Sequence, residues 1–208
     1  MPLIKLNATQ GLTGTLPAVS GANLTGIASD FVKIVAFDIS SSTASVSFEH
    51  GTSGVDFTGT TYRSHLIIFS DVHMVDDNDR IYVQIRDSGG SYDNASNKYF
   101  ENRFHLMNDS VGGLSGNESS ARLSNGGTDS GRRHSTIEGM INLFNFNTTT
   151  SQSKVMYQTH LSFVDSQTYH NDSVGTHCRD DEAATTGIKL IGGSGSIEAG
   201  TFTLYSRK

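Results

Sequence analysis

The chain has 208 residues and a formal net charge of −6, and 35% of its residues are hydrophobic. This length allows one substantial core, whereas the negative charge, with no run of Lys and Arg, argues against nucleic acid as a partner. The apolar runs are too short for a membrane-spanning helix, so we expect no membrane insertion. The single cysteine, Cys178, excludes an intramolecular disulfide.

Residues 1–30 carry single apolar side chains along an otherwise polar strip. Ordering the backbone costs about 1–2 kcal/mol per residue, which exceeds what a few buried aliphatic side chains return. The strip therefore cannot fold alone. We expect an extended N-terminal arm that docks on other subunits, with a disordered tail as the alternative. The anchors of this assembly arm include Leu12, Leu16, Pro17, Leu24 and Ile27.

From residue 31 onward the pattern predicts eight to ten β-strands and no long helix. The clearest alternation lies in residues 80–87, where Ile81, Val83 and Ile85 share one side. We therefore predict one all-β domain over residues 31–208, an antiparallel, jelly-roll-like β-sandwich. The expected strands are residues 31–40, 43–50, 62–76, 80–87, 98–107, 120–124, 136–147, 154–165, 187–193 and 200–208.

For two of these segments the sequence also predicts which side chains share one face of the strand. Strict alternation in residues 62–76 places Leu66, Ile68, Val72 and Met74 on one side of the strand. In residues 98–107, Phe100, Phe104 and Leu106 are in phase with one another. Residues 108–135 are a long polar stretch, and loops of this length are usually functional or mobile.

Several residues could in principle bind a metal ion. His65 and His73 are eight residues apart, which places both on one strand face if no bulge intervenes. His170, His177, Cys178 and Asp180 share one polar segment but lack a regular ligand spacing. The acidic runs at 76–79 and 179–182 lack the glycine and glutamate of an EF-hand loop. We therefore expect no metal site and no cofactor.

The sequence lacks two familiar catalytic motifs. The sequence contains neither a G-x-S-x-G nucleophile elbow nor an H-E-x-x-H zinc motif. Cys178 follows His177 directly, and adjacent residues of a strand face opposite ways. We therefore expect a protein that is not an enzyme, and a polysaccharide-cleaving activity is a distant third alternative.

Two short motifs carry a resemblance to a known class of proteins. The segment LPAVSGANLTGI, residues 16–27, resembles a recurrent segment of bacteriophage tail-fibre and related virion proteins. The C-terminal GTFTLYSRK, residues 200–208, is similar to endings of structural proteins in marine cyanobacterial phages, although Ser206 stands where those endings usually have glycine. The resemblance implies a virion structural protein, made in the host bacterial cytoplasm, that forms a homotrimer with a jelly-roll-like terminal domain.

Two functional classes follow from this resemblance. In the first, a short fibre or spike presents its sandwich to a host-surface glycan or protein, with Tyr92, Tyr169 and residues 108–135 as the contacts. In the second, the chain is a capsid decoration protein or a tail connector whose residues 1–30 clamp other virion proteins, with no receptor role.

Overall fold

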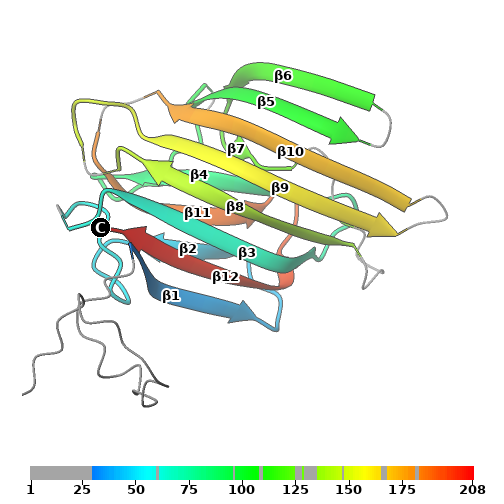
Figure 1. The fold of residues 1–208 in the computed structure, drawn as a ribbon, viewed down its shortest axis with the longest axis horizontal. Coiled ribbons are helices and arrows are strands. Elements are labelled where there is room, and N and C mark those ends of the chain that lie inside the picture. The colour runs from blue at the N-terminus through cyan, green and yellow to red at the C-terminus, as the bar shows by residue number, and fades with distance from the viewer. Residues whose placement is uncertain are drawn as a thin grey trace, which may run out of the picture.

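The computed structural model describes residues 30–59, 61–95, 97–107, 110–124, 128, 135–146, 148–164, 168–180 and 183–208. These residues form twelve β-strands in two antiparallel sheets, with no helix among them (Figure 1). The all-β, antiparallel sandwich predicted from the sequence is confirmed. No helix in this part of the chain is long and apolar enough to cross a membrane.

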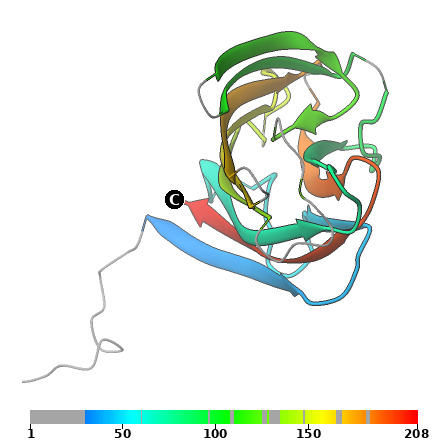
Figure 2. The ribbon, with the colours of Figure 1, turned by 90° about the vertical axis from the view of Figure 1, so that its right-hand side faces the viewer.

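The larger sheet has eight strands, and neighbours in its order pair through the backbone. Their order is β1 (Phe31–Ile39), β12 (Ile197–Arg207), β3 (Ser64–Met74), β8 (Thr136–Phe144), β9 (Lys154–Val164), β10 (Thr168–Arg179), β5 (Tyr99–Met107) and β6 (Ser110–Glu118). The smaller sheet has four strands, in the order β2 (Ser45–Glu49), β11 (Thr185–Gly192), β4 (Ile81–Asp87) and β7 (Ala121–Arg122). The large sheet is curved and wraps around the small one (Figure 2).

The apolar core lies where the two sheets face each other. Strand β4 has the alternation expected from the sequence, because Ile81, Val83 and Ile85 are fully buried. Ile141 and Leu143 of β8 are buried on the facing sheet. Period-two alternation of this kind is what a strand with one solvated face requires.

The small sheet covers only part of the large one. At one end, Phe37 of β1 contacts Phe48 of β2, with ring centroids 5.3 Å apart. At the other end, the Thr159 hydroxyl of β9 donates a hydrogen bond of 2.7 Å to the carbonyl oxygen of Leu123, directly after β7. Strands β5 and β6 lie beyond this point (Figure 2). At this end the inner faces of β5 and β10 meet the small sheet through polar contacts, since the Tyr99 hydroxyl accepts a bond from the Ile85 amide and His177 Nε2 lies 3.1 Å from the Arg122 carbonyl oxygen.

Strand β3 departs from strict alternation. Its register with β8 shifts between Phe69 and Val72, and Asp71 has a positive φ of 53°. The neighbouring Gly200 of β12 has φ 140°, and a Cβ there would approach Val72 to 2.9 Å. This bulge reverses the direction of the side chains that follow it.

The bulge corrects two expectations. Val72 and Met74 are fully buried, whereas Ile68 is exposed, so these residues do not share one side of the strand. His65 is buried on the inner face and His73 is only partly buried, since the extra residue separates their faces. The spacing of eight therefore does not bring the two imidazoles together.

Two strands lie in segments for which the sequence indicated no strand. Strand β6 occupies part of the stretch 108–135, and β10 spans Thr168–Arg179. Both are rich in polar residues and glycine. The predicted arm, with Leu12, Leu16, Pro17, Leu24 and Ile27, lies outside the described residues, so it and its boundary at residue 30 stay predictions.

Candidate functional site

The outer face of the large sheet is unusually apolar for a surface exposed to water. Seven large hydrophobic side chains on it are between 41% and 52% exposed. Single exposed hydrophobic residues are common, but a contiguous patch marks an interaction surface. We call the set the outer apolar face, and its members are Ile68, Phe100, Phe104, Leu106, Met140, Met156 and Val174.

The strand register makes this face contiguous. Phe104 of β5 lies opposite Val174 of β10, which lies opposite Gln158 of β9. Gln158 is in turn opposite Met140 of β8, which is opposite Ile68 of β3. Five neighbouring strands thus present one row of side chains, and four of the five are apolar. No charged side chain interrupts this row.

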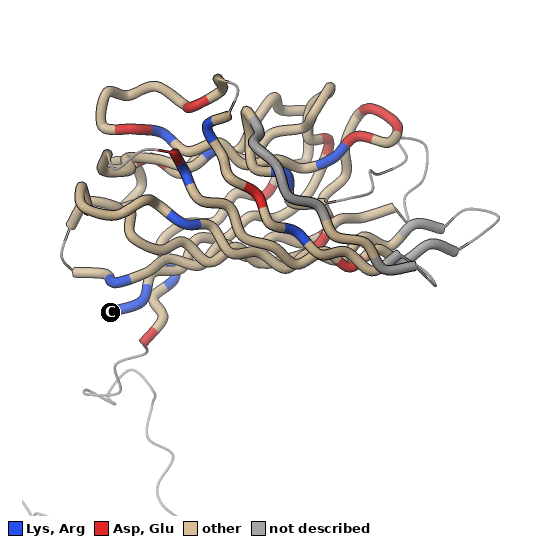
Figure 3. The backbone as a smooth tube through the Cα atoms, turned by 90° about the horizontal axis from the view of Figure 1, so that it is seen from above, with Lys and Arg blue, Asp and Glu red and all other residues tan. Residues whose placement is uncertain are grey.

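Charged groups flank the row instead. His160 and Asp172 face each other across β9 and β10, with Nδ1 and Oδ1 2.6 Å apart. Together with Glu138, Met140 and Ile68 they line a hollow of about 330 Å³. Because both partners of the ion pair are largely exposed, it contributes little to stability. Acidic and basic residues elsewhere are scattered over both sheets and their connections (Figure 3).

The inner face of the same strands is polar where an apolar core would be expected. Arg103 and Glu101 of β5 are buried, and Arg103 Nε lies 3.2 Å from Glu101 Oε1. Across the sheet, Arg103 is opposite Gly175, and Gly175 is opposite Tyr157. We call the whole set the inner polar cluster: Glu101, Arg103, His105, Arg122, Tyr157, Asn171 and His177.

His177 fixes one side of this cluster. Burial, together with the charges of Arg103 and Arg122, lowers its pKa to about 4, although a bond to the Arg122 carbonyl opposes the shift. The imidazole is therefore neutral at neutral pH. Its Nε2 lies 3.1 Å from that carbonyl oxygen and must donate to it, which leaves Nδ1 as an acceptor. The ring stacks on Tyr157, with centroids 5.5 Å apart.

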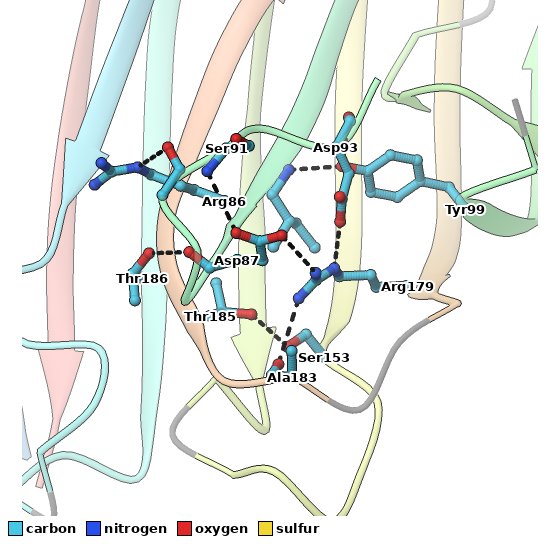
Figure 4. Close-up of polar contacts among 12 residues, drawn as sticks. Arg86, Asp87, Ser91, Asp93, Tyr99, Ser153, Arg179, Ala183, Thr185 and Thr186 are labelled. Atoms are coloured by element: carbon cyan, nitrogen blue, oxygen red, sulfur yellow. Dashed lines mark hydrogen bonds and ion pairs between the residues drawn. The ribbon is translucent and has the colours of Figure 1, made fainter. Parts of the chain in front are cut away.

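A second buried arginine, Arg179, differs from Arg103 because acceptors among the described residues lie within hydrogen-bond distance of its guanidinium. Arg179 of β10 donates to the Asp93 carboxylate and, at 3.3 Å, to the Ala183 carbonyl oxygen (Figure 4). Asp93 belongs to the segment between β4 and β5. The Tyr99 hydroxyl donates a bond of 3.2 Å to the Asp93 carbonyl oxygen and accepts one of 2.7 Å from the Ile85 amide of β4. This group has a structural role, since it ties that segment to both sheets.

The predicted recognition residues are placed as follows. Tyr92 is half-buried, its hydroxyl donates to Glu49 at 2.9 Å, and the Lys189 ammonium lies 4.3 Å from the centre of its ring. Burial raises the pKa of Tyr92 to about 12. The backbone of Tyr169 pairs with Phe163 in the β9–β10 ladder, but its side chain lies outside the described residues.

The histidines singled out from the sequence do not gather. Within the described ranges, no group of three or more His, Cys, Asp or Glu side chains could hold a metal ion. His65 is buried, its Nδ1 lies 2.7 Å from the Ser206 hydroxyl, and burial lowers its pKa to about 4. Ser206, the departure noted in the C-terminal motif, therefore has a structural partner.

Comparison with known proteins adds no relative. No protein-family model, no curated protein and no solved structure matches this chain. The function must therefore be argued from the sequence and the two faces of the large sheet.

Sequence reasoning did not find either face. The in-phase Phe100, Phe104 and Leu106 were a usable signal, because the alternating Glu101 and Arg103 between them had to face the other way. Which of the two sets was buried could not be decided from the strand alone. The sequence contains no signal that β9 and β10 would lie beside this strand.

Proposed function

We propose that this chain is a structural protein of a bacteriophage virion, a homotrimer of the short-fibre or spike kind. In this proposal its β-sandwich projects from the particle and contributes to adhesion to the host surface. The role is structural and not enzymatic. The observation that carries the proposal is the outer apolar face, because a surface of this kind is covered in stable assemblies.

The outer apolar face has the size of the apolar centre of an interface with other copies of the chain. It spans four strand spacings, from β5 to β3, and about six residues along β5. At about 4.8 Å per spacing and 3.4 Å per residue, this is roughly 19 Å by 20 Å. Standard interfaces bury about 800 Å² per partner, with an apolar centre and a polar rim. The row from Phe104 to Ile68 would form that centre, and His160, Asp172 and Glu138 would form part of the rim.

A threefold assembly needs two different surfaces on each subunit, because each subunit meets two neighbours. The face divides naturally into two such halves. One half is carried by β5 and β10, with Phe104 and Val174 as its most exposed members, and the other by β8 and β3, with Met140 and Ile68. In the proposed trimer these two halves pack against each other around the axis.

The resemblance of both ends of the chain to phage virion proteins supports the biological setting. Residues 16–27 would join the sandwich to other virion proteins, and the C-terminal motif forms part of β12, next to the edge strand β1 of the large sheet. Trimerisation raises the effective concentration of each host contact, so shallow sites such as the surface around Tyr92 can suffice.

Sedimentation of the purified 208-residue chain tests the proposal. We expect a particle of three times 22.4 kDa. The double variant Phe104→Gln/Val174→Thr removes the most exposed apolar pair of the face and should sediment as a monomer. Val75→Thr is the matched control, since Val75 is 40% exposed but lies in a turn outside the face. A wild-type chain that stays monomeric at all concentrations, or a double variant that stays trimeric, overturns the proposed interface.

Adhesion is tested separately with the same material. Trimers should bind cells of the host bacterium and compete with infection by the phage. If trimers bind no cells, and the protein is instead present in many copies on the head and its loss lowers capsid stability, the decoration role replaces adhesion. The apolar face would serve assembly in both cases.

A further inference from the structure

The inner polar cluster contains buried polar atoms, both donors and the acceptor Nδ1 of His177, that make no hydrogen bond among the described residues. The Arg103 side chain is fully buried, and its nearest acceptor is Glu101. Among the described residues, neither terminal nitrogen of its guanidinium makes a hydrogen bond. Asn171 Nδ2 likewise makes none in this part of the chain, and the polar neighbour of the Tyr157 hydroxyl is Arg103 itself. Buried polar groups in folded proteins are nearly always satisfied, so these groups call for a partner.

The charge of the cluster defines the kind of partner. Arg103 and Arg122 are close enough to influence the same groups, and the acidic residue facing them within the described part is Glu101. Burial lowers the pKa of Arg103, which measures the desolvation of its charge. An arginine nevertheless stays protonated in proteins. The described groups therefore carry two positive charges against one negative, together with neutral donors.

Two glycines on the paired strands make room for two rings of the cluster. A Cβ at Gly175 would lie 2.6 Å from the Tyr157 hydroxyl, so the tyrosine ring lies flat over this position and toward Arg103. A Cβ at Gly112 would lie 2.5 Å from the ring of His105. In both places a side chain on the paired strand would displace a ring of the cluster. The absence of Cβ atoms lets the polar rings lie over the sheet.

The cluster also reaches the surface. His105 and Arg122 are only partly buried, whereas Arg103, His177 and Tyr157 are fully or almost fully buried. The partly exposed members thus lie on β5 and β7, and the buried members lie on β5, β10 and β9.

We infer that the inner polar cluster is a binding site for a small oxyanion, a carboxylate or phosphate group. A planar guanidinium pairs with such a group through two parallel hydrogen bonds, which suits the terminal nitrogens of Arg103. The hydroxyl of Tyr157, which lies beside Arg103, supplies a further donor. The inference does not depend on the virion role, since it concerns the inside of the sandwich and not the outer face.

Titration of the full chain with three probes tests the inference. These are sodium glucuronate, inorganic phosphate and glucose, which is the neutral counterpart of glucuronate. Binding is followed by calorimetry and by the NMR signals of the arginine Nε–H groups, at constant ionic strength. We expect saturable binding of glucuronate or phosphate, with a shift of the Arg103 signal, and none for glucose. Glucuronate binding identifies a carboxylate ligand, and binding of phosphate alone identifies a phosphate.

Two variants connect the binding to the cluster. Arg103→Met should weaken binding at least about tenfold, because it removes the charge-assisted pair. Tyr157→Phe removes only a hydroxyl and keeps the ring that packs in the core, so it should fold normally and bind more weakly. Arg86→Met is the matched control, because Arg86 belongs to the small sheet and pairs with Glu49 far from the cluster in the register. Thermal melts of each variant check its folding.

Several outcomes would overturn the inference. They are the absence of saturable binding of both oxyanions, equal binding of glucose, and unchanged affinity in a folded Tyr157→Phe variant. A crystal structure at saturating glucuronate and phosphate that holds only ordered waters at Arg103 would do the same. In that case the cluster is a hydrated structural network.

Discussion

The Nε of Arg179 donates a hydrogen bond to the carboxylate of Asp93, and the arginine side chain is completely buried. Removing the arginine would leave a nearly buried carboxylate without its cation. Losing one member of a buried pair costs about 3–5 kcal/mol. We therefore expect Arg179→Met to lower the free energy of unfolding by that amount, as measured by urea denaturation.

The neighbouring Arg86–Glu49 pair provides the comparison (Figure 4 shows both arginines). The Nη1 of Arg86 and the Oε2 of Glu49 lie 3.2 Å apart, but both side chains are partly exposed. Pairs in contact with water contribute about 1 kcal/mol or less, so Arg86→Met should cost no more than this. Equal losses in the two variants would show that burial does not determine the strength of these pairs.

Asp79 joins the turn before β4 to the turn between β11 and β12. Its carboxylate accepts backbone N–H bonds from Gly193 at 2.8 Å, Ser194 at 3.1 Å and Gly195 at 3.0 Å, and it is almost fully buried. Hydrogen bonds to a charged group contribute about 1.5–3 kcal/mol each, but they are not additive. Asp79→Ala should lower the free energy of unfolding by about 2–4 kcal/mol.

The matched change for this prediction is Glu198→Ala, an exposed carboxylate of β12. Surface substitutions of this kind usually stay within about 0.5 kcal/mol. If Asp79→Ala and Glu198→Ala have the same small effect in denaturation experiments, the carboxylate does not hold the two turns together.

Two buried histidines predict a loss of stability in acid. Burial lowers the pKa of both His65 and His177 to about 4, against about 6.5 in an unfolded chain. Asp56 faces His65, and Arg103 and Arg122 face His177. The folded protein holds both rings neutral, so their contribution is complete above pH 6.5 and decreases as the pH falls toward 4. Each histidine can account for about 3 kcal/mol.

Urea denaturation between pH 7.5 and pH 4.5 measures this dependence. The double variant His65→Gln/His177→Gln should show a shallower decrease in unfolding free energy over this range, whatever its stability at pH 7.5. A decrease as steep as that of the wild type would mean that the two imidazoles are not the groups that take up the protons.

The bulge in β3 gives a prediction about backbone strain. Asp71 has φ 53°, a conformation that Asp and Asn tolerate but a β-branched residue rarely adopts. Asp71→Val should lower the free energy of unfolding by about 1–2 kcal/mol, whereas Asp71→Asn should have little effect. Thr176→Val, at an exposed and regular position of β10, is the control and should stay within about 0.5 kcal/mol. An equally stable Asp71→Val variant would contradict the assigned backbone conformation.

The sequence predicted the strands whose faces differ in polarity. In β4 the buried Ile81, Val83 and Ile85 alternate with partly exposed polar residues, and in β8 the same holds for Ile137 and Ile141. These strands belong to the two facing sheets, so one side packs in the apolar core and the other is in contact with water. In such strands the period-two alternation of apolar and polar residues predicts which side chains are buried.

For the strands that carry the candidate sites, the buried side could not be predicted in this way. The buried positions of β10 include Asn171, Ser173 and His177, while its exposed positions include Val174. In β5 the buried Arg103 and the exposed Phe104 reverse the usual preference. The cause is tertiary, since the inner faces of these strands meet polar groups of the small sheet, such as the Arg122 carbonyl oxygen. The bulge at Asp71 could not be predicted from the sequence either, because it depends on Gly200 of another strand.

The central claim is that copies of the chain cover the outer apolar face. Methionine oxidation by dilute hydrogen peroxide, followed by mass spectrometry, tests it most directly, because Met140 and Met156 lie on this face and Met74 is a buried reference. We predict that both face methionines are protected in the wild-type chain and become reactive in Phe104→Gln/Val174→Thr. Oxidation of Met140 and Met156 at the same rapid rate in both proteins would contradict the claim.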